Sequence, residues 1–277
     1  MDTVQLTQLA ETIYEHCGID YRKNLSSLES KVAGRLGELG LSCWEYNGYL
    51  RTGTGEWDVL IELITINETF FFREENLLEE FQKEILPQFK DRTALNPLRI
   101  WCAACSTGEE PYTLGMLIEE SGIFMPGAVQ IIASDINKKV IKKAKSGLYN
   151  KKSFSFRKMP IDAYEKFFTD EGDEYRIKEA VMNYADFRVM NLLDKNIVGK
   201  IEKSDIIICR NVLIYFDSKA IQTIVDSFTD ILKPNGILIL GHSESLTHYR
   251  HDFETIYTDR TFYYRKGGNS LWNNMEY

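Results

Sequence analysis

The feature that most constrains the fold is a series of short apolar runs, each followed by a helical stretch, that begins at Leu98. Strands of a parallel sheet read as nearly continuous apolar runs, because helices cover both of its faces. This alternation predicts an α/β fold with a doubly wound sheet. The predicted strands are LRIWCAA (98–104), VQIIASD (129–135), FRVMNLL (187–193), DIIICRN (205–211) and GILILGHSE (236–244).

Three further segments belong to this predicted domain, which runs from 98 to 277. A helix over 218–232 carries a stripe of apolar residues, and the segment 233–236 (KPNG) ends it before the last parallel strand. The segment FETIYTDRTFYYRK (253–266) is typical of a β-hairpin that closes the sheet. The stretch from about 150 to 186 interrupts the alternation and is too long for a plain connection, so it predicts an inserted subdomain.

The first 89 residues show a different pattern. Apolar residues such as Leu6, Leu9 and Ile13 recur at helical spacing, with no strand alternation. We therefore predict a small all-helical N-terminal domain, 1–89, and a linker to about residue 97 that ends in a turn. Its last helix, 76–89, should stop or bend near Pro87.

The composition excludes several classes of function. A net charge of −8 argues against nucleic-acid binding, which depends on neutralising phosphates. No apolar run is long enough to cross a membrane, and the N-terminus lacks the features of a secretory signal, so a cytoplasmic protein is expected. We also expect a monomer without a metal. Cys102 and Cys105 have CxxC spacing, but without a second ligand pair ordinary buried thiols are favoured over zinc or redox chemistry.

The turn after the first predicted strand, AACSTGEE (103–110), consists of small residues followed by two carboxylates. Small residues let a ligand approach the backbone closely before a helix begins near Pro111. The turn is not the GxGxxG of a dinucleotide site, and Glu109 and Glu110 lie where phosphates would bind. This pattern favours a cationic ligand without phosphates and argues against a nicotinamide-dependent oxidoreductase.

Polar residues follow the other predicted strands. In an open α/β sheet, ligands bind beyond the carboxyl ends of the strands. Asp135 ends the second strand and could accept hydrogen bonds from both hydroxyls of a ribose, although a helix N-cap is an alternative role. Asn191 follows the third strand, and Arg210 and Asn211 follow the fourth. An isolated Asn in such a place is more often a turn residue, but convergence of these ends on one crevice favours a binding site.

In these turns, and in several other motifs, the chain resembles the chemoreceptor glutamate methyltransferases, the CheR family. The resemblance covers nearly the whole chain in the right order and predicts a Rossmann-like class I methyltransferase that uses S-adenosylmethionine. It also implies that the inserted subdomain is a small β-structure. The phrases that carry it are TINETFFFR (65–73), WCAACSTGEEPYT (101–113), ASDIN (133–137), NLL (191–193), CRNVLIYF (209–216) and GHSE (241–244).

The resemblance implies a set of site residues. It places Arg73 and Tyr215 beside the transferred methyl group. From the residues alone, a surface salt bridge to Glu74 or Glu75 is the alternative for Arg73, and a core aromatic role is the alternative for Tyr215. Cofactor contacts are implied for Asn67, Thr69, Arg73, Glu110, Asp135, Asn191, Leu192, Arg210 and Asn211.

Other noticeable residues receive less weight. We expect His242 to make a structural polar contact, because no Ser-His-Asp order supports a nucleophile relay. The run Phe70–Phe72 is expected to form a packed hinge between domains, and one of its rings is a candidate for a contact with the adenine. The lysines of 138–145 are expected to form a solvated helix face.

The implied substrates are glutamates on the cytoplasmic helices of methyl-accepting chemotaxis receptors. Some family members dock a receptor tail on the insertion, but FFTDEGDEYRIK (167–178) is acidic with one glycine, so tail tethering is not expected here. We instead expect the helical domain to recognise the receptor through Arg22, Lys23, Lys31 and Arg35. The alternatives are a methyltransferase of another protein or small acid, and a noncatalytic cofactor-sensing module.

Overall fold

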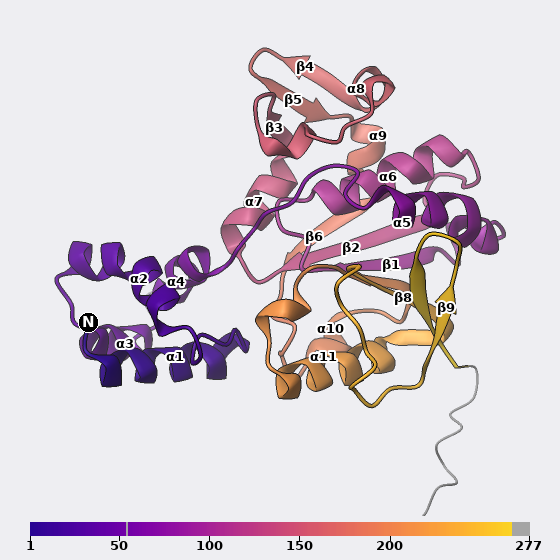
Figure 1. The fold of residues 1–277 in the computed structure, drawn as a ribbon. Coiled ribbons are helices and arrows are strands. Elements are labelled where there is room, and N and C mark those ends of the chain that lie inside the picture. The colour runs from indigo at the N-terminus through magenta and orange to yellow at the C-terminus, as the bar shows by residue number, and fades with distance from the viewer. Residues whose placement is uncertain (54, 268–277) are drawn as a thin grey trace, which may run out of the picture.

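The computed structural model describes residues 1–53 and 55–267, so the last ten residues of the predicted 98–277 domain lie outside the described part. It contains a seven-stranded sheet in the order β6-β2-β1-β7-β8-β10-β9 (Figure 1). The first five strands in this order are parallel, and β10 and β9 pair antiparallel. The strands are β1 (Leu98–Ala103), β2 (Val129–Asp135), β6 (Ala185–Val189), β7 (Ser204–Cys209), β8 (Leu232–Leu240), β9 (Phe253–Tyr257) and β10 (Phe262–Lys266).

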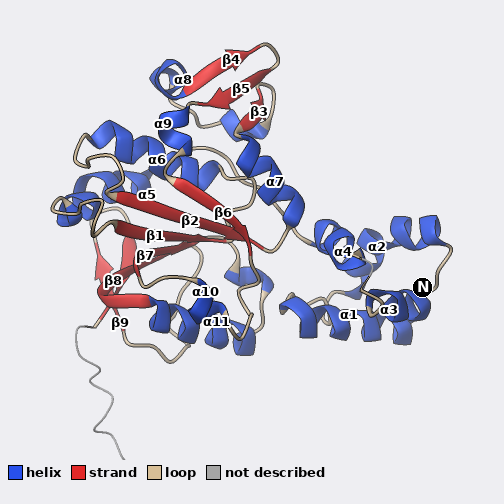
Figure 2. Ribbon diagram, turned by 180° about the vertical axis from the view of Figure 1, so that it is seen from behind, coloured by secondary structure: helices blue, strands red, loops and turns tan. Residues whose placement is uncertain are grey.

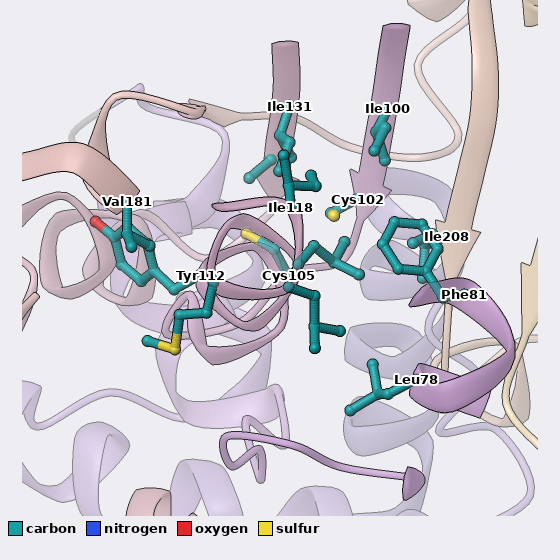
Figure 3. Packing of buried hydrophobic residues seen from close by; sticks show 14 of the residues in the cluster. Leu78, Phe81, Ile100, Cys102, Cys105, Tyr112, Ile118, Ile131, Val181 and Ile208 are labelled. Carbon is teal, nitrogen blue, oxygen red and sulfur yellow. The ribbon is translucent and has the colours of Figure 1, made fainter. Parts of the chain in front are cut away.

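Helices cover both faces of this sheet, as the sequence predicts (Figures 1 and 2). Residues of β1 alternate between two cores: Ile100 and Cys102 pack with one set of helices, whereas Trp101 and Ala103 pack with the other. Figure 3 shows the first core, where Ile118 lies beside Ile131 of β2 and Tyr112 lies beside Val181. These helices are α5 (Glu75–Glu80) and α6 (Glu109–Ser121) on one side, and α10 (Ile197–Lys200) and α11 (Ser218–Ile231) on the other; α7 (Lys138–Ser146) follows β2.

The predicted helix 218–232 is confirmed, since α11 spans all but its last residue. Its apolar stripe is buried, namely Ile221, Ile224, Val225, Phe228 and Ile231. The prediction that the segment 233–236 ends the helix is wrong, because β8 already begins at Leu232. These residues instead bulge from the edge shared with β7, where the register jumps between Ser204 and Ile206. Asn235 takes a positive φ of 61° there.

The inserted subdomain is a three-stranded antiparallel sheet in the order β3-β5-β4. It begins at Leu148, two residues before the predicted start. Its predicted end at 186 is too late, because Ala185 and Asp186 already belong to β6. Its elements are β3 (Leu148–Asn150), a 3-10 turn (Phe154–Phe156), α8 (Ile161–Phe167), β4 (Phe168–Glu171), β5 (Glu174–Ile177) and α9 (Glu179–Met182).

The N-terminal helices form a separate core built from residues between Leu6 and Ile64. The segment from Phe71 to Leu86 packs instead into the core of the large sheet. The predicted region 1–89 therefore contains two packing units, and the cores separate near residue 65. The N-terminal helices are α1 (Thr3–Cys17), α2 (Leu25–Leu39), α3 (Cys43–Leu50) and α4 (Glu56–Ile64); α5 continues into π-helical (Phe81–Ile85) and 3-10 (Leu86–Phe89) turns.

The helical unit is tied to the sheet domain at two places. Ile19 forms a β-bridge with Phe216, and the backbone N–H of Asp20 donates to the carbonyl of Tyr215 at 3.1 Å. At the second place, Asn137 donates its side-chain amide to the Thr65 hydroxyl at 2.8 Å. None of the helices in the described residues is long and apolar enough to span a membrane.

Candidate active site

A cleft of about 1130 Å³, including space open to solvent, lies beyond the carboxyl ends of β1, β2, β6 and β7. The helical unit forms one of its walls through Cys17, Ile19 and Ile64. This is the place where an open α/β sheet binds its ligand. All ten site residues predicted from the sequence line it, namely Asn67, Thr69, Arg73, Glu110, Asp135, Asn191, Leu192, Arg210, Asn211 and Tyr215.

The turn after β1 brings backbone up to the cleft. Ala104 and Ser106 take positive φ values of 62° and 50°, and Gly108 has a φ of 95°. A Cβ at Gly108 would lie 2.8 Å from the Cβ of Ala144, so only glycine fits there. The small residues predicted to allow close approach thus serve a sharply bent turn.

Only one of the two adjacent glutamates faces the cleft. Glu110 lines it, and its Oε2 accepts a hydrogen bond from Arg210 at 2.8 Å. Glu109 is buried elsewhere and accepts hydrogen bonds from the hydroxyls of Thr107 (2.6 Å) and Ser155 (2.7 Å). The prediction that both acids approach the ligand is therefore wrong for Glu109. Burial raises the pKa of both carboxyls, although Arg210 opposes the shift at Glu110.

Asp135 ends β2 with both carboxylate oxygens engaged by backbone. Oδ2 accepts from the N–H of Ser106 and Oδ1 from the N–H of Asn137, each at 2.9 Å. The N-cap of α7 is Asn137, so the alternative role of Asp135 as that cap is excluded. Burial raises the pKa of Asp135, and the backbone donors oppose the shift.

Arg210 is a buried residue of the cleft wall that connects several of its neighbours. Its guanidinium donates to Glu110 at 2.8 Å, to Glu74 at 3.3 Å and to the carbonyl of Arg73 at 2.7 Å. Its donors are thus directed at protein groups, and it positions the neighbours that face the ligand. Burial opposes ionisation of Glu74, but Arg210 and His242 together lower its pKa. The expected structural contact of His242 is this pairing with Glu74, at 3.1 Å.

Glu244 supports the cleft from behind, a role that the sequence analysis missed. Its buried carboxylate accepts four backbone hydrogen bonds of 2.8–2.9 Å from two loops. These bonds fix the strained turn at Asn211 (φ 58°) and the 3-10 turn Leu213–Tyr215 that follows it. The donors are the N–H groups of Asn211, Val212, Leu213 and Gly241.

Asn191 and Asn67 have structural contacts as well as places in the cleft. Asn191 donates to the carbonyl of His16 at 2.8 Å and accepts from the N–H of Leu193 at 3.0 Å, so it is also a turn residue. Asn67 donates to the Thr65 hydroxyl at 3.1 Å. Asn191 therefore links the helical unit to the end of β6, whereas the Asn67 side chain stays within the exit segment and its backbone carbonyl accepts from the Ser106 hydroxyl at 3.0 Å.

Arg73, Tyr215 and Glu68 also line the cleft, and Glu68 is exposed to solvent, so we refer to these three residues as the cleft mouth. Arg73 forms no ion pair with Glu74 or Glu75; it donates one bond to the carbonyl of Glu68 at 3.1 Å. The salt-bridge alternative for Arg73 is therefore excluded. Tyr215 is half-buried and lines the cleft, which excludes a purely core role. Burial raises its pKa, and the nearby Arg73 opposes the shift.

Comparison with known proteins places this geometry in a family. The family described as CheR methyltransferase, SAM binding domain, matches residues 67–262. The chain belongs to the CheR methyltransferase family. It is 33% identical to the chemotaxis protein methyltransferase of Escherichia coli, over 90% of this chain and 88% of that protein. Identity is 34% to chemotaxis protein methyltransferase 2 of Pseudomonas aeruginosa (88% and 87%) and 31% to the Borreliella burgdorferi protein (87% and 88%).

The cofactor of this CheR methyltransferase is S-adenosylmethionine, and the cleft fits it. Each oxygen of Asp135 accepts one backbone bond and retains a lone pair for a ribose hydroxyl. The buried Oδ1 of Asn211 has no hydrogen-bond partner within the described residues, so it can accept a bond from a ligand. Glu110 adds an acceptor for a cationic group, and the turn after β1 has no glycine-rich phosphate cradle. The contact made by each predicted residue stays a prediction.

Two cations of the expected receptor-binding patch are paired within the chain, and the patch itself stays a prediction. Arg22 pairs with Asp20 at 2.8 Å and Asp217 at 2.9 Å, and Arg35 pairs with Glu56 at 2.8 Å. Both guanidiniums therefore form ion pairs with carboxylates of the same chain. The helical unit is also acidic, with ten Asp and Glu against five Lys and Arg in residues 1–64.

Two of the minor predictions also change. The lysines of 138–145 are not only a solvated face, because Lys138 pairs with Asp58 of α4 at 3.0 Å and Lys139 pairs with Glu62. The aromatic run is not a hinge packed between the units, because Phe71 and Phe72 pack into the core of the large sheet. Phe70 lines the cleft, while the buried ring of Phe71 lies 4.9 Å from that of Tyr149. The expected buried thiols are confirmed, since all five cysteines are buried and free.

Proposed function

We propose that the protein transfers the methyl group of S-adenosylmethionine to glutamate carboxylates of methyl-accepting chemotaxis receptors. The products are glutamate methyl esters and S-adenosylhomocysteine. The observation that carries the proposal is that Arg73 and Tyr215 border the mouth of the cleft that contains Asp135 and Glu110. The names of the relatives from Escherichia coli and Pseudomonas aeruginosa support a role in chemotaxis, where such methylation serves sensory adaptation.

The acceptor requires orientation more than activation. A glutamate carboxylate, with a reference pKa of about 4.3, is ionised at neutral pH, so no general base is needed. Arg73 uses its guanidinium at the cleft mouth to hold the carboxylate by charge-assisted hydrogen bonds. Tyr215, whose hydroxyl has no hydrogen-bond partner in the described part of the chain, supplies a donor or acceptor beside the reacting groups.

The cofactor, when bound, supplies a methyl group on a positively charged sulfur, which a carboxylate oxygen can displace in line. The protein contributes alignment and exclusion of water. Ile19 and Ile64 from the helical unit and Phe70 from the segment that follows give the cleft an apolar wall. We propose that this unit also takes part in recognising the receptor, because its wall lies next to the cleft mouth.

Calorimetric titration tests the cofactor site first. S-adenosylmethionine and S-adenosylhomocysteine should bind, and NAD should not. Asp135→Asn removes the negative charge and one of the two acceptor oxygens offered to the ribose, so the affinity for the cofactor should fall by about tenfold or more. An unchanged affinity in this variant would contradict the assignment of Asp135.

Methyl transfer to a receptor cytoplasmic fragment then tests the substrate. Arg73→Ala and Tyr215→Phe should lower kcat while leaving S-adenosylhomocysteine affinity within a few-fold of the parent protein. Normal turnover in both variants would sink the assigned roles. Cofactor binding with labelling of a different protein or a small acid would favour that substrate class. Binding without transfer to any carboxylate would favour a cofactor-sensing module.

A further inference from the structure

The inserted subdomain is fixed directly to the segment that leads to Arg73. The N–H of Phe71 donates to the carbonyl of Ser155 at 2.9 Å, and the Ser155 hydroxyl donates to Glu109 at 2.7 Å. The rings of Phe71 and Phe156 lie 5.4 Å apart. The 3-10 turn Phe154–Phe156 therefore has a defined position relative to the cleft, and so does the residue that follows it.

That residue is Arg157, which places a second guanidinium near the cleft mouth. Its Cζ lies 3.7 Å from the ring centroid of Phe70, in stacking contact, and Phe70 lines the cleft. The Cζ of Arg73 lies 5.7 Å from the same centroid. The two guanidinium carbons can therefore be no more than 9.4 Å apart.

Arg157 keeps its hydrogen-bonding capacity for an external partner. Within the described residues its charged neighbour is Glu68, at 3.6 Å, which is too long for a hydrogen bond. The side chains are 40% and 72% exposed, so the pair contributes little. Other surface arginines, such as Arg22, Arg35 and Arg176, form ion pairs shorter than 3.2 Å, whereas the contact of Arg157 with Glu68 is longer.

We propose that Arg157 binds a second carboxylate of the acceptor, next to the glutamate that Arg73 orients. The inference rests on the proposed function and deepens it, because it specifies the acceptor as an acidic helical segment with two carboxylates. Side chains three or four positions apart on a helix have Cβ atoms about 5–6 Å apart. Two such carboxylates can meet two guanidiniums within 9.4 Å of each other. Arg157 takes no part in bond making and acts on substrate specificity.

The matched variants are Arg157→Gln and Lys158→Gln. Lys158 is the next residue and is also exposed, so both remove one positive charge at nearly the same place. With a receptor cytoplasmic fragment as substrate, Arg157→Gln should raise KM by about tenfold, the effect of losing a hydrogen bond between charged groups. The value of kcat and the affinity for S-adenosylhomocysteine should stay unchanged. Lys158→Gln should alter KM less than twofold.

A substrate variant makes the test specific. Mass spectrometry identifies the methylated glutamate, and acidic residues within four positions of it are changed to Gln. The KM of the parent enzyme for this altered substrate should then rise by about tenfold. Arg157→Gln should show no further rise in KM on the same substrate. Additive losses, or equal effects of Arg157→Gln and Lys158→Gln, would overturn the inference. Arg157→Lys provides a second variant that keeps the charge but loses the bidentate geometry, and it should show an intermediate KM.

The proposed function can fail separately in the same experiment. If the parent protein binds S-adenosylhomocysteine but methylates no receptor fragment, receptor methylation is refuted, and the role of Arg157 falls with it. If the parent protein methylates the fragment and Arg157→Gln does so with an unchanged KM, only the role of Arg157 is refuted.

Discussion

The substitution Glu244→Gln should disturb the site without touching the ligand. The Glu244 carboxylate accepts two backbone bonds at each oxygen: Oε1 from Val212 and Leu213, and Oε2 from Asn211 and Gly241. A glutamine keeps one oxygen and places an NH₂ group where the other oxygen stood. Two buried N–H donors then face a donor and lose their partner.

The magnitude follows from these two lost bonds. A buried donor left without a partner costs about 1–3 kcal/mol, so the free energy of unfolding should fall by about 2–6 kcal/mol. The turn is closely packed, since a Cβ at Gly241 would lie 2.8 Å from the Asn211 side-chain amide and from Glu244. It therefore has little room to move so that the two N–H groups find new partners. The freed turn carries Asn211 and Tyr215, so kcat for methyl transfer should fall as well.

Urea unfolding at pH 7.5 measures the first effect, with Glu254→Gln as control. Glu254 lies exposed on β9, and its substitution should change the unfolding free energy by no more than about 0.5 kcal/mol. If Glu244→Gln cost less than about 1 kcal/mol and left kcat unchanged, the carboxylate would not be holding the two loops. The same result would remove the argument that the turn at Asn211 is fixed by Glu244.

Three other outcomes follow from buried charge and backbone geometry. Burial raises the pKa of Glu109, so at a pH between the two pKa values the folded state holds a proton that the unfolded state has released. The free energy of unfolding therefore falls as the pH rises from the unfolded-state pKa of about 4.3 to the higher pKa of the folded state. Glu109→Gln removes this loss, so its urea midpoint should gain on the parent between pH 4 and pH 7.5, and a constant difference would refute the burial argument. Gly18→Ala places a side chain at φ 77°, so the free energy of unfolding should fall by about 1–2 kcal/mol. As a control, Gly37→Ala lies inside α2 with open space around it, so the free energy of unfolding should rise by about 0.5–1 kcal/mol. Arg35→Gln leaves the buried Glu56 without its ion pair, so thermal unfolding should occur at lower temperature while KM for a receptor fragment stays unchanged; a raised KM would restore Arg35 to the receptor surface.

The parts of the fold that could be predicted are those with strong periodicity. The strand β2 coincides with its predicted run, and β1 and β7 agree with theirs within two residues at each end, because burial on both faces makes these runs continuously apolar. The ends of strands were harder to predict where the strand includes exposed residues. The first two residues of β6, Ala185 and Asp186, pair with β2 but are not apolar enough to be recognised.

Side-chain direction explains most of what the sequence did not reveal. Glu109 and Glu110 are adjacent on a helix, so their side chains point about 100° apart, and only one can face the cleft. The sequence pattern does not determine which of the two side chains the helix directs toward the cleft. The partners of Arg22 and Arg210 were equally inaccessible, because Asp217 is 195 residues from Arg22 and Glu110 is 100 residues from Arg210. Such pairs depend on the tertiary fold.

The charges around the cleft are separated in a way that suits two oppositely charged ligands. Its inner part presents Glu110 and Asp135, and Arg210 is occupied by neutralising Glu74 and Glu110, so a cationic cofactor meets net negative charge there. The mouth presents Arg73 and Glu68, with Arg157 beyond Phe70, so two cations face one carboxylate there. A protein with a net charge of −8 would repel an acidic substrate unless cations stood at the point of entry. These two arginines therefore make approach of an acidic acceptor compatible with an acidic enzyme, and they do so without adding positive charge where the cofactor binds.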